Sequence, residues 1–116
     1  MNQLTNIFKL LSDDTRLRIL LLLYQEDLCV CEISGILNIP QPRVSQIFSK
    51  LRDLNLVSDE RVEKFVFYSL KKQDDFFIQI LEQVMNQKSS YPQLKIDSER
   101  LANKKQFFNP LCKTPE

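Results

Sequence analysis

The chain has 116 residues, of which 43% are hydrophobic and 27% are charged, with 16 Lys and Arg residues against 15 Asp and Glu residues. This length allows one domain with a modest core and excludes a multidomain enzyme. The absence of His excludes imidazole acid–base chemistry and zinc sites with imidazole ligands. The apolar run 19–24 is much shorter than the roughly 20 residues of a membrane span. No charged-then-apolar signal peptide opens the chain, so we expect a cytoplasmic protein whose three cysteines stay reduced.

The first half of the chain shows helical spacing of apolar residues. A short amphipathic helix is predicted over about Leu4–Leu11, and Ser12 is a suitable N-cap for a second helix over about Asp13–Tyr24. The second helix is apolar on nearly all sides, which predicts that it is the central and most buried element. A third helix is predicted over about Glu32–Leu37, followed by a turn at 38–42.

The fourth helix has the clearest pattern. Pro42 suits its first position, and one apolar stripe is formed by Val44, Ile47, Phe48, Leu51 and Leu54. The opposite face is therefore polar and outward. Two β-rich runs, about Leu56–Asp59 and Phe65–Ser69, flank a charged turn and predict a hairpin. A fifth helix is expected over about Asp74–Gln87, and a further capped helix from Ser98.

This order of elements is typical of a winged helix-turn-helix, a mainly α fold with a small β-hairpin. A helix fits the major groove of DNA, and a hairpin then lies over the neighbouring backbone. The charge agrees, because residues 41–72 carry seven basic and four acidic side chains. The alternative is an ordinary amphipathic helix whose polar face meets only water. On the DNA-binding interpretation, the DNA-facing residues are Gln41, Arg43, Ser45, Gln46, Ser49 and Lys50, and Arg61 and Lys64 contact phosphates.

Three separated stretches carry a resemblance to a known family. The stretch 11–20 (Leu-Ser-Asp-Asp-Thr-Arg-Leu-Arg-Ile-Leu), the stretch 27–33 (Asp-Leu-Cys-Val-Cys-Glu-Ile) and the stretch 41–46 (Gln-Pro-Arg-Val-Ser-Gln), with Leu-Arg at 51–52 and Leu-Val at 56–57, closely resemble the ArsR/SmtB metalloregulatory repressors over about residues 4–88. Leu-Cys-Val-Cys resembles the arsenic- and antimony-sensing branch. The resemblance implies a homodimeric repressor, not an enzyme, that binds a palindromic operator and releases it when As(III) or Sb(III) binds thiolates.

The chain departs from the family pattern in three places. Ser34 stands where such arsenic sensors often have a third cysteine, and Glu63 stands where the wing turn commonly has Gly, so a wider or differently twisted hairpin tip is expected. Residues 89–116 extend beyond the matched domain 1–88 and contain the third thiol, Cys112.

The cysteines suit a soft ion. Trivalent arsenic and antimony favour three thiolates, and three cysteines without His fit that need better than they fit tetrahedral zinc. Residues two apart share a face only in an extended segment, so a grip by Cys29 and Cys31 requires this stretch to be non-helical. The adjacent helix N-terminus is expected to lower the thiol pKa, and Cys112 of either subunit to complete the site. The alternatives are a buried apolar role for the pair and an incidental tail cysteine.

Other function classes stay open at this stage. Oxidation of Cys29, Cys31 or Cys112 on the same scaffold would give a thiol-redox regulator. A thiol enzyme or an arsenic carrier without a DNA role is disfavoured because the chain lacks a His base, a Cys-x-x-Cys motif and a glycine-rich phosphate loop. A dimer is expected from the apolar faces of the first and fifth helices. No obligatory cofactor is expected.

Overall fold

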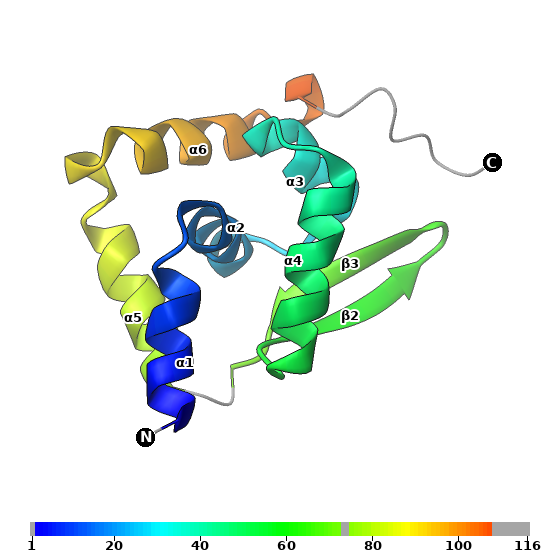
Figure 1. Ribbon diagram of the computed structural model, residues 1–116. Helices are drawn as coiled ribbons and strands as arrows, with labels where there is room; N and C mark the ends of the chain where they lie inside the picture. The colour runs from blue at the N-terminus through cyan, green and yellow to red at the C-terminus, as the bar shows by residue number, and fades with distance from the viewer. Residues whose placement is uncertain (1, 73–74, 108–116) are drawn as a thin grey trace.

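The computed structural model describes residues 2–72 and 75–107, and it is mainly helical with one small antiparallel sheet (Figure 1). Its elements are, in chain order, α1 (Asn2–Leu11), α2 (Asp14–Gln25), β1 (Leu28–Cys29), α3 (Val30–Leu37), α4 (Gln41–Asp53), β2 (Val57–Val62), β3 (Phe65–Leu70), α5 (Asp75–Asn86), the 3-10 helix η1 (Lys88–Ser90), α6 (Pro92–Ala102) and the 3-10 helix η2 (Lys104–Phe107). The expected fold class is confirmed. Asp74, the expected start of the fifth helix, lies outside the described residues.

Helix α2 is the centre of the molecule. The run 19–23 is buried, and α2 packs against α1, α5, α6 and β3 (Figure 1). Its N-cap is Asp13 rather than the expected Ser12: the Asp13 carboxylate accepts a hydrogen bond of 2.9 Å from the Arg16 N–H. The Ser12 hydroxyl instead donates to the Lys9 carbonyl at 2.7 Å, so it closes the end of α1.

The sheet has the strand order β1-β3-β2, with both pairs antiparallel. Residues 57–62 pair with residues 65–70, which leaves two residues at the hairpin tip. The expectation of a wider tip is therefore wrong, because Glu63 adopts the left-handed φ of 58° that a tight turn requires. The strand β1, which sequence analysis missed, adds Leu28 and Cys29 to the other edge of β3.

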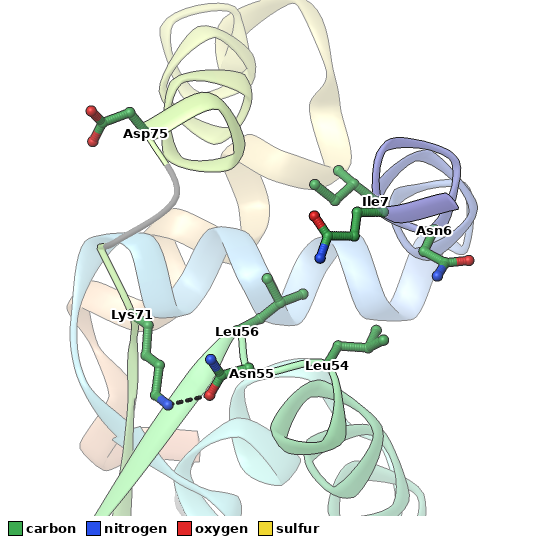
Figure 2. A pocket seen from close by; sticks show the side chains of 8 residues that line it. Asn6, Ile7, Leu54, Asn55, Leu56, Lys71 and Asp75 are labelled. Carbon is green, nitrogen blue, oxygen red and sulfur yellow. Dashed lines mark hydrogen bonds between the residues drawn. The ribbon is translucent and has the colours of Figure 1, made fainter. Parts of the chain in front are cut away.

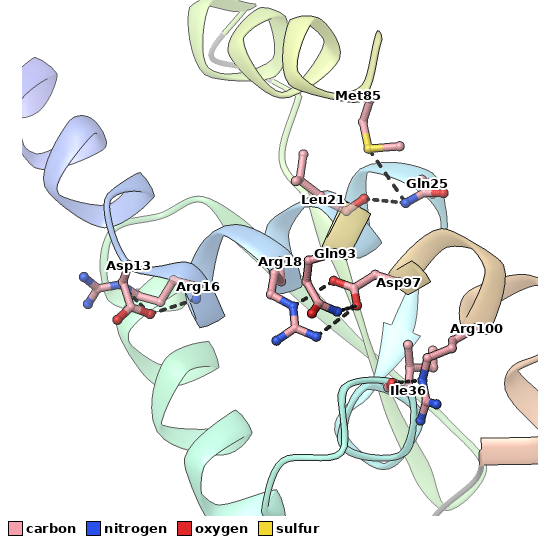
Figure 3. Close-up of polar contacts among 10 residues, drawn as sticks. All are labelled: Asp13, Arg16, Arg18, Leu21, Gln25, Ile36, Met85, Gln93, Asp97 and Arg100. Carbon is pink, nitrogen blue, oxygen red and sulfur yellow. Dashed lines mark hydrogen bonds and ion pairs between the residues drawn. The ribbon is translucent and has the colours of Figure 1, made fainter. Parts of the chain in front are cut away.

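Helix α6 completes the core. It begins at Pro92, in place of the expected start at Ser98, because a proline in the first turn loses no hydrogen bond there. Leu101 is buried, and Arg100 donates to the carbonyl of Ile36 at 2.6 Å, which ties α6 to α3 (Figure 3). Figure 1 shows α6 running across the end of the molecule, beside α3. Residues 89–107 are thus packed onto the helical domain.

Candidate nucleic-acid interface and thiol site

Helices α3 and α4 pack together as a helix-turn-helix. Asn38 ends α3 with a left-handed φ of 56°, which Asn tolerates better than most residues. The Ser34 hydroxyl donates to the Ile39 carbonyl at 2.6 Å, and the Ile39 N–H donates to the Ser34 carbonyl at 3.2 Å. Pro40 is the N-cap of α4, and Pro42 lies in its first turn. The turn therefore sets the angle between the two helices.

The burial of α4 leaves one polar face outward. Val44, Phe48 and Leu51 are buried against the core. The structure brings the predicted DNA-facing residues together on the opposite face: Arg43, Ser45, Gln46, Ser49 and Lys50 are exposed, and Gln41 is half-buried. An exposed row of donors and acceptors on a single helix has the form that reading base edges requires.

The β2–β3 hairpin, which is the wing of this fold, packs beside α4. The rings of Phe48 and Tyr68 stack with centroids 4.0 Å apart and planes at 12°, so α4 and β3 share one aromatic contact. The predicted phosphate-contacting residues Arg61 and Lys64 are exposed near the hairpin tip. The Arg61 Nε donates to the Glu63 carbonyl at 3.3 Å, which orients the guanidinium at the tip.

A pocket of about 430 Å³ lies where α1, the end of α4 and the base of the wing meet (Figure 2). Asn55, with a φ of 63°, makes the turn from α4 into β2. The Lys71 ammonium donates to the Asn55 side-chain oxygen, and the Lys71 N–H donates to the Leu56 carbonyl at 2.9 Å. These bonds fix the base of the wing relative to α4.

Cys29 belongs to two elements at once. It pairs with Phe67 across the sheet, and it is the extended N-cap of α3. Its side chain is buried, with only 3% of its surface exposed, and its N–H donates to a Glu32 carboxylate oxygen at 3.2 Å. The expectation of a lowered thiol pKa is wrong. Burial raises the pKa of Cys29 because the thiolate loses its hydration, and the Glu32 charge raises it further, against smaller opposing backbone hydrogen bonds.

Cys31 differs from Cys29 in conformation. It lies in the first turn of α3, so the expectation of a wholly non-helical Cys-x-Cys stretch is wrong: α3 starts two residues earlier than expected, directly after Cys29. Cys31 is half-buried and disulfide-bonded, so the expectation that all three cysteines stay reduced is wrong; Cys29 is a free thiol. Both cysteines line a cavity of about 260 Å³ between the start of α3 and β3, which Lys64 also reaches. Cys112 lies outside the described residues.

Sequence analysis missed two charged residues beside the cysteines. Glu32 caps Cys29, a pairing that the spacing of a cap and an acid three residues later could have indicated. Lys104 of η2 forms ion pairs with Glu26 and, at 2.9 Å, with Glu32. Desolvation opposes the charge of Lys104, but its two acidic partners raise its pKa. No local pattern predicts a contact between residues so far apart in the chain.

The comparisons with known proteins agree with this geometry. The pattern of "Bacterial regulatory protein, arsR family" matches residues 13–59. Over 86 residues, the chain is 36% identical to the arsenic resistance transcriptional regulator ArsR2 of Pseudomonas putida, an alignment that covers 73% of this chain and 75% of ArsR2. The chain belongs to the arsR family. As expected from the sequence, this is a family of regulatory proteins rather than enzymes.

Two further relatives of this arsR-family chain are informative. It is 42% identical over 65 residues to the arsenic resistance transcriptional regulator ArsR1 of Pseudomonas putida, covering 55% of this chain and about half, 51%, of ArsR1. The crystal structure of the antimony-specific transcriptional repressor AntR superposes with a TM-score of 0.65 at 25% identity, over 79% of this chain and 82% of AntR. The winged-helix arrangement is therefore shared with a solved repressor.

None of the helices in the described ranges 2–72 and 75–107 is both long and apolar enough to cross a bilayer. Within these same ranges, no three His, Cys, Asp or Glu side chains are grouped as metal ligands.

Proposed function

We propose that this protein is a transcriptional repressor that binds a palindromic operator as a homodimer and releases it when As(III) or Sb(III) binds cysteine thiolates. In this proposal α4 enters the major groove with Gln41, Arg43, Ser45, Gln46, Ser49 and Lys50 on its groove side. Arg61 and Lys64 of the wing contact phosphates. The exposed polar face of α4 beside a basic hairpin tip supports this part.

The thiol part of the proposal assigns Cys29 and Cys31 as the principal ligands and Cys112 as the third. Soft trivalent ions favour thiolate sulfur over oxygen ligands. The shared cavity of Cys29 and Cys31 supports the assignment. Because Cys31 lies in the first turn of α3, a grip by both sulfurs requires that turn to unwind. Because Cys31 is disulfide-bonded in the structure, ion binding requires the reduced protein. Because Cys29 is buried as a neutral thiol, ion binding also releases its proton. The protein needs no resident cofactor for this response.

The position of Cys29 is the single observation that carries the proposal. Cys29 is a strand residue paired with Phe67 of the wing and also the residue that begins α3, which packs against α4. An ion that pulls this sulfur toward Cys31 changes the start of α3 and the edge of the wing sheet together. A coupling free energy of about 1–3 kcal/mol, typical of allosteric proteins, changes DNA affinity roughly 5- to 150-fold.

The dimer part rests on the outer faces of α1 and α5. Phe8 and Phe76 are 52% and 46% exposed, and their rings meet edge to face with centroids 6.4 Å apart. Leu4 adds a further exposed apolar side chain on α1. Apolar side chains gathered in this way favour burial against a second copy, and two copies read the two halves of a palindrome.

The test titrates reduced protein onto duplex DNA from the region upstream of its own gene and then adds arsenite. We expect arsenite to release the wild type and to leave the Cys29→Ser, Cys31→Ser double variant bound. Cys112→Ser tests the third ligand, and we expect this variant to lose sensitivity to arsenite as well. Release of the double variant by arsenite would show that the ligand assignment is wrong.

A second candidate function is a thiol-redox regulator on the same DNA-binding scaffold. The disulfide-bonded state of Cys31 is the observation that favours it. In the same titration, release by peroxide, reversal by a thiol reductant and indifference to arsenite would select this function over metalloid sensing.

A further inference from the structure

Three basic side chains from three different helices surround one small cavity. The cavity has a volume of about 150 Å³, and its lining includes Lys9 of α1, Arg16 of α2 and Lys50 of α4, together with Asn6, Leu10 and Leu54. Among the residues that the structure describes, no acidic side chain lines it. Of these cations, only Lys50 was singled out by the sequence pattern. A concentration of positive charge from separate elements marks a site for an anion.

Arg16 is held in place before any ligand arrives. Its Nε donates to the Leu10 carbonyl at 3.2 Å and its Nη2 to the Lys9 carbonyl at 3.3 Å, so the guanidinium caps the end of α1. Figure 3 shows Arg16 with Asp13 at the junction of α1 and α2. Asp13 is the acidic neighbour, and its oxygen lies 4.0 Å from the Arg16 Nε. The same Asp13 carboxylate accepts the N-cap hydrogen bond from the backbone N–H of Arg16, which partly offsets its negative charge.

The two lysines complete the cluster from either side. Both are exposed, and within the described ranges 2–72 and 75–107 neither forms an ion pair. Their ammonium groups are therefore available to pair with an external anion.

The cluster is continuous with the outer face of α4. Arg43 and Lys50 are seven residues apart on one helix and hence share a face. Near the start of α4, the Arg43 Nη2 donates to the Thr15 hydroxyl at 3.4 Å. Further along α4, Lys50 and Arg16 line the same cavity. The beginning of α2 thus runs beside the face that is proposed to read DNA.

We propose that Lys9, Arg16 and Lys50 form a clamp for a backbone phosphate of duplex DNA, which fixes the register of α4 in the major groove. This inference rests on the proposed function, because it requires α4 to lie in the groove. The walls of a major groove are rows of phosphates, so cations beside the inserted helix face such a wall. Phosphate contacts of this kind position a protein without reading sequence.

The test measures the affinity for mixed-sequence duplex DNA as a function of salt concentration, by fluorescence anisotropy. The slope of log K against log salt is negative, and each lost cation–phosphate contact reduces its magnitude by about 0.9. We expect Lys9→Gln and Lys50→Gln each to reduce the magnitude of the slope by about that amount and to weaken binding roughly fivefold near 0.15 M salt. Lys9→Arg, which keeps the charge, is expected to retain the wild-type slope.

The matched control is Lys95→Gln. Lys95 is exposed on α6 and does not line the cavity. We expect it to leave the slope unchanged, and an equal loss in this control would overturn the clamp by showing an effect of net charge alone. An unchanged slope in both Lys9→Gln and Lys50→Gln, with a wild type that binds DNA, overturns the clamp alone. A wild type that binds no duplex at low salt overturns the proposed function itself.

A second arm separates DNA phosphate from a free anion. Inorganic phosphate is titrated at constant ionic strength while the amide signals of Lys9 and Lys50 are followed by NMR. Saturable shifts, combined with wild-type salt slopes in the glutamine variants, would assign the cluster to a free anion and overturn the clamp. Amide shifts that do not saturate with phosphate, together with salt slopes of reduced magnitude in the glutamine variants, support the clamp.

Discussion

The guanidinium of Arg18 and the carboxylate of Asp97 form a two-pronged ion pair, with Nε–Oδ2 at 2.8 Å and Nη2–Oδ1 at 2.9 Å (Figure 3). Asp97 is only 3% exposed and also accepts a hydrogen bond of 2.9 Å from Gln93. The pair joins the central helix α2 to α6, and it raises the pKa of Arg18, chiefly through the hydrogen bond to Asp97. The C-terminal helix is therefore fixed to the centre of the molecule by charge as well as by apolar packing.

Removing the acid of this pair is expected to be costly. Asp97→Ala leaves the partly buried Arg18 without its partner, and we expect the free energy of unfolding to fall by about 3 kcal/mol. The measurement is chemical denaturation at neutral pH. Asp59→Ala is the matched control, because Asp59 forms an exposed pair with Arg52 at 2.8 Å, and such pairs contribute about 1 kcal/mol or less. Equal effects of the two substitutions would contradict the importance of the buried pair.

The thiol of Cys29 is expected to react with alkylating reagents only at high pH. Burial raises its pKa above the ordinary value of 9.0, so at a given pH the folded protein holds less thiolate than the unfolded chain. In a Cys31→Ser, Cys112→Ser variant, the pH midpoint for alkylation should lie higher in the folded protein than in urea. By linkage, the neutral thiol stabilises the fold below pH 9, and this contribution is lost as the pH rises above that value. A folded midpoint below the unfolded one would show the opposite sign.

Arg43 and Arg52 lie on the same helix but should differ in their effect on sequence preference. Arg43 lies on the outward face of α4, whereas Arg52 is paired with Asp59 at the base of the wing. We expect Arg43→Ala to reduce the preference for an operator over mixed-sequence DNA by about 1–3 kcal/mol, because it removes a base contact. Arg52→Ala serves as control and should leave that preference unchanged. Competition binding with both duplexes gives the ratio, and an unchanged ratio for Arg43→Ala would remove Arg43 from the reading face.

The apolar patch on α1 and α5 predicts the oligomeric state. Phe8→Glu places a charge where a second copy is expected to pack, so the variant should sediment as a monomer at micromolar concentration while the wild type sediments as a dimer. Ile96→Glu is the matched control, since Ile96 is 47% exposed on α6, outside the patch. A dimeric Phe8→Glu variant, or a monomeric wild type, would contradict the proposed interface.

The wing tip carries a residue in an unfavourable conformation. Glu63 has a φ of 58°, which costs an L-residue about 1–2 kcal/mol relative to the right-handed region, whereas Gly adopts it freely. After allowing for the greater entropy of Gly in the unfolded chain, we expect Glu63→Gly to stabilise the protein by about 0.5–1 kcal/mol. Glu60→Gly, in the middle of β2, should instead destabilise it by a similar amount. Thermal or chemical denaturation of both variants decides the sign.

The sequence predicted the helices that have a strong apolar period. The stripe of α4 is an example, because Val44, Phe48 and Leu51 are spaced so that burying them necessarily turns Arg43 outward. The two-residue strand β1 was missed because it exists only through pairing with β3, some 40 residues later, and has no period of its own. The spacing of residues within one segment cannot reveal such a partner.

The errors at the thiol site have a similar origin. Position at a helix N-terminus suggested a lowered pKa for Cys29, but its burial by other parts of the chain has the larger effect. The start of α6 was misplaced because Ser98 is a good capping residue in isolation, whereas Asp97 is drawn into the helix by Arg18 on α2. In both places tertiary contacts outweighed the local preference.

Lys104 binds two acids that bracket both cysteines of the α2–α3 region. Glu26 lies just after α2 and Glu32 lies in the first turn of α3, so one ammonium group draws the two ends of the segment 26–32 together. The number of residues between the end of α6 and Lys104 therefore determines how closely Glu26 and Glu32 are held together. A single glycine inserted after Asn103 would displace the ammonium and loosen the segment, and solvent would reach the sulfur of Cys29.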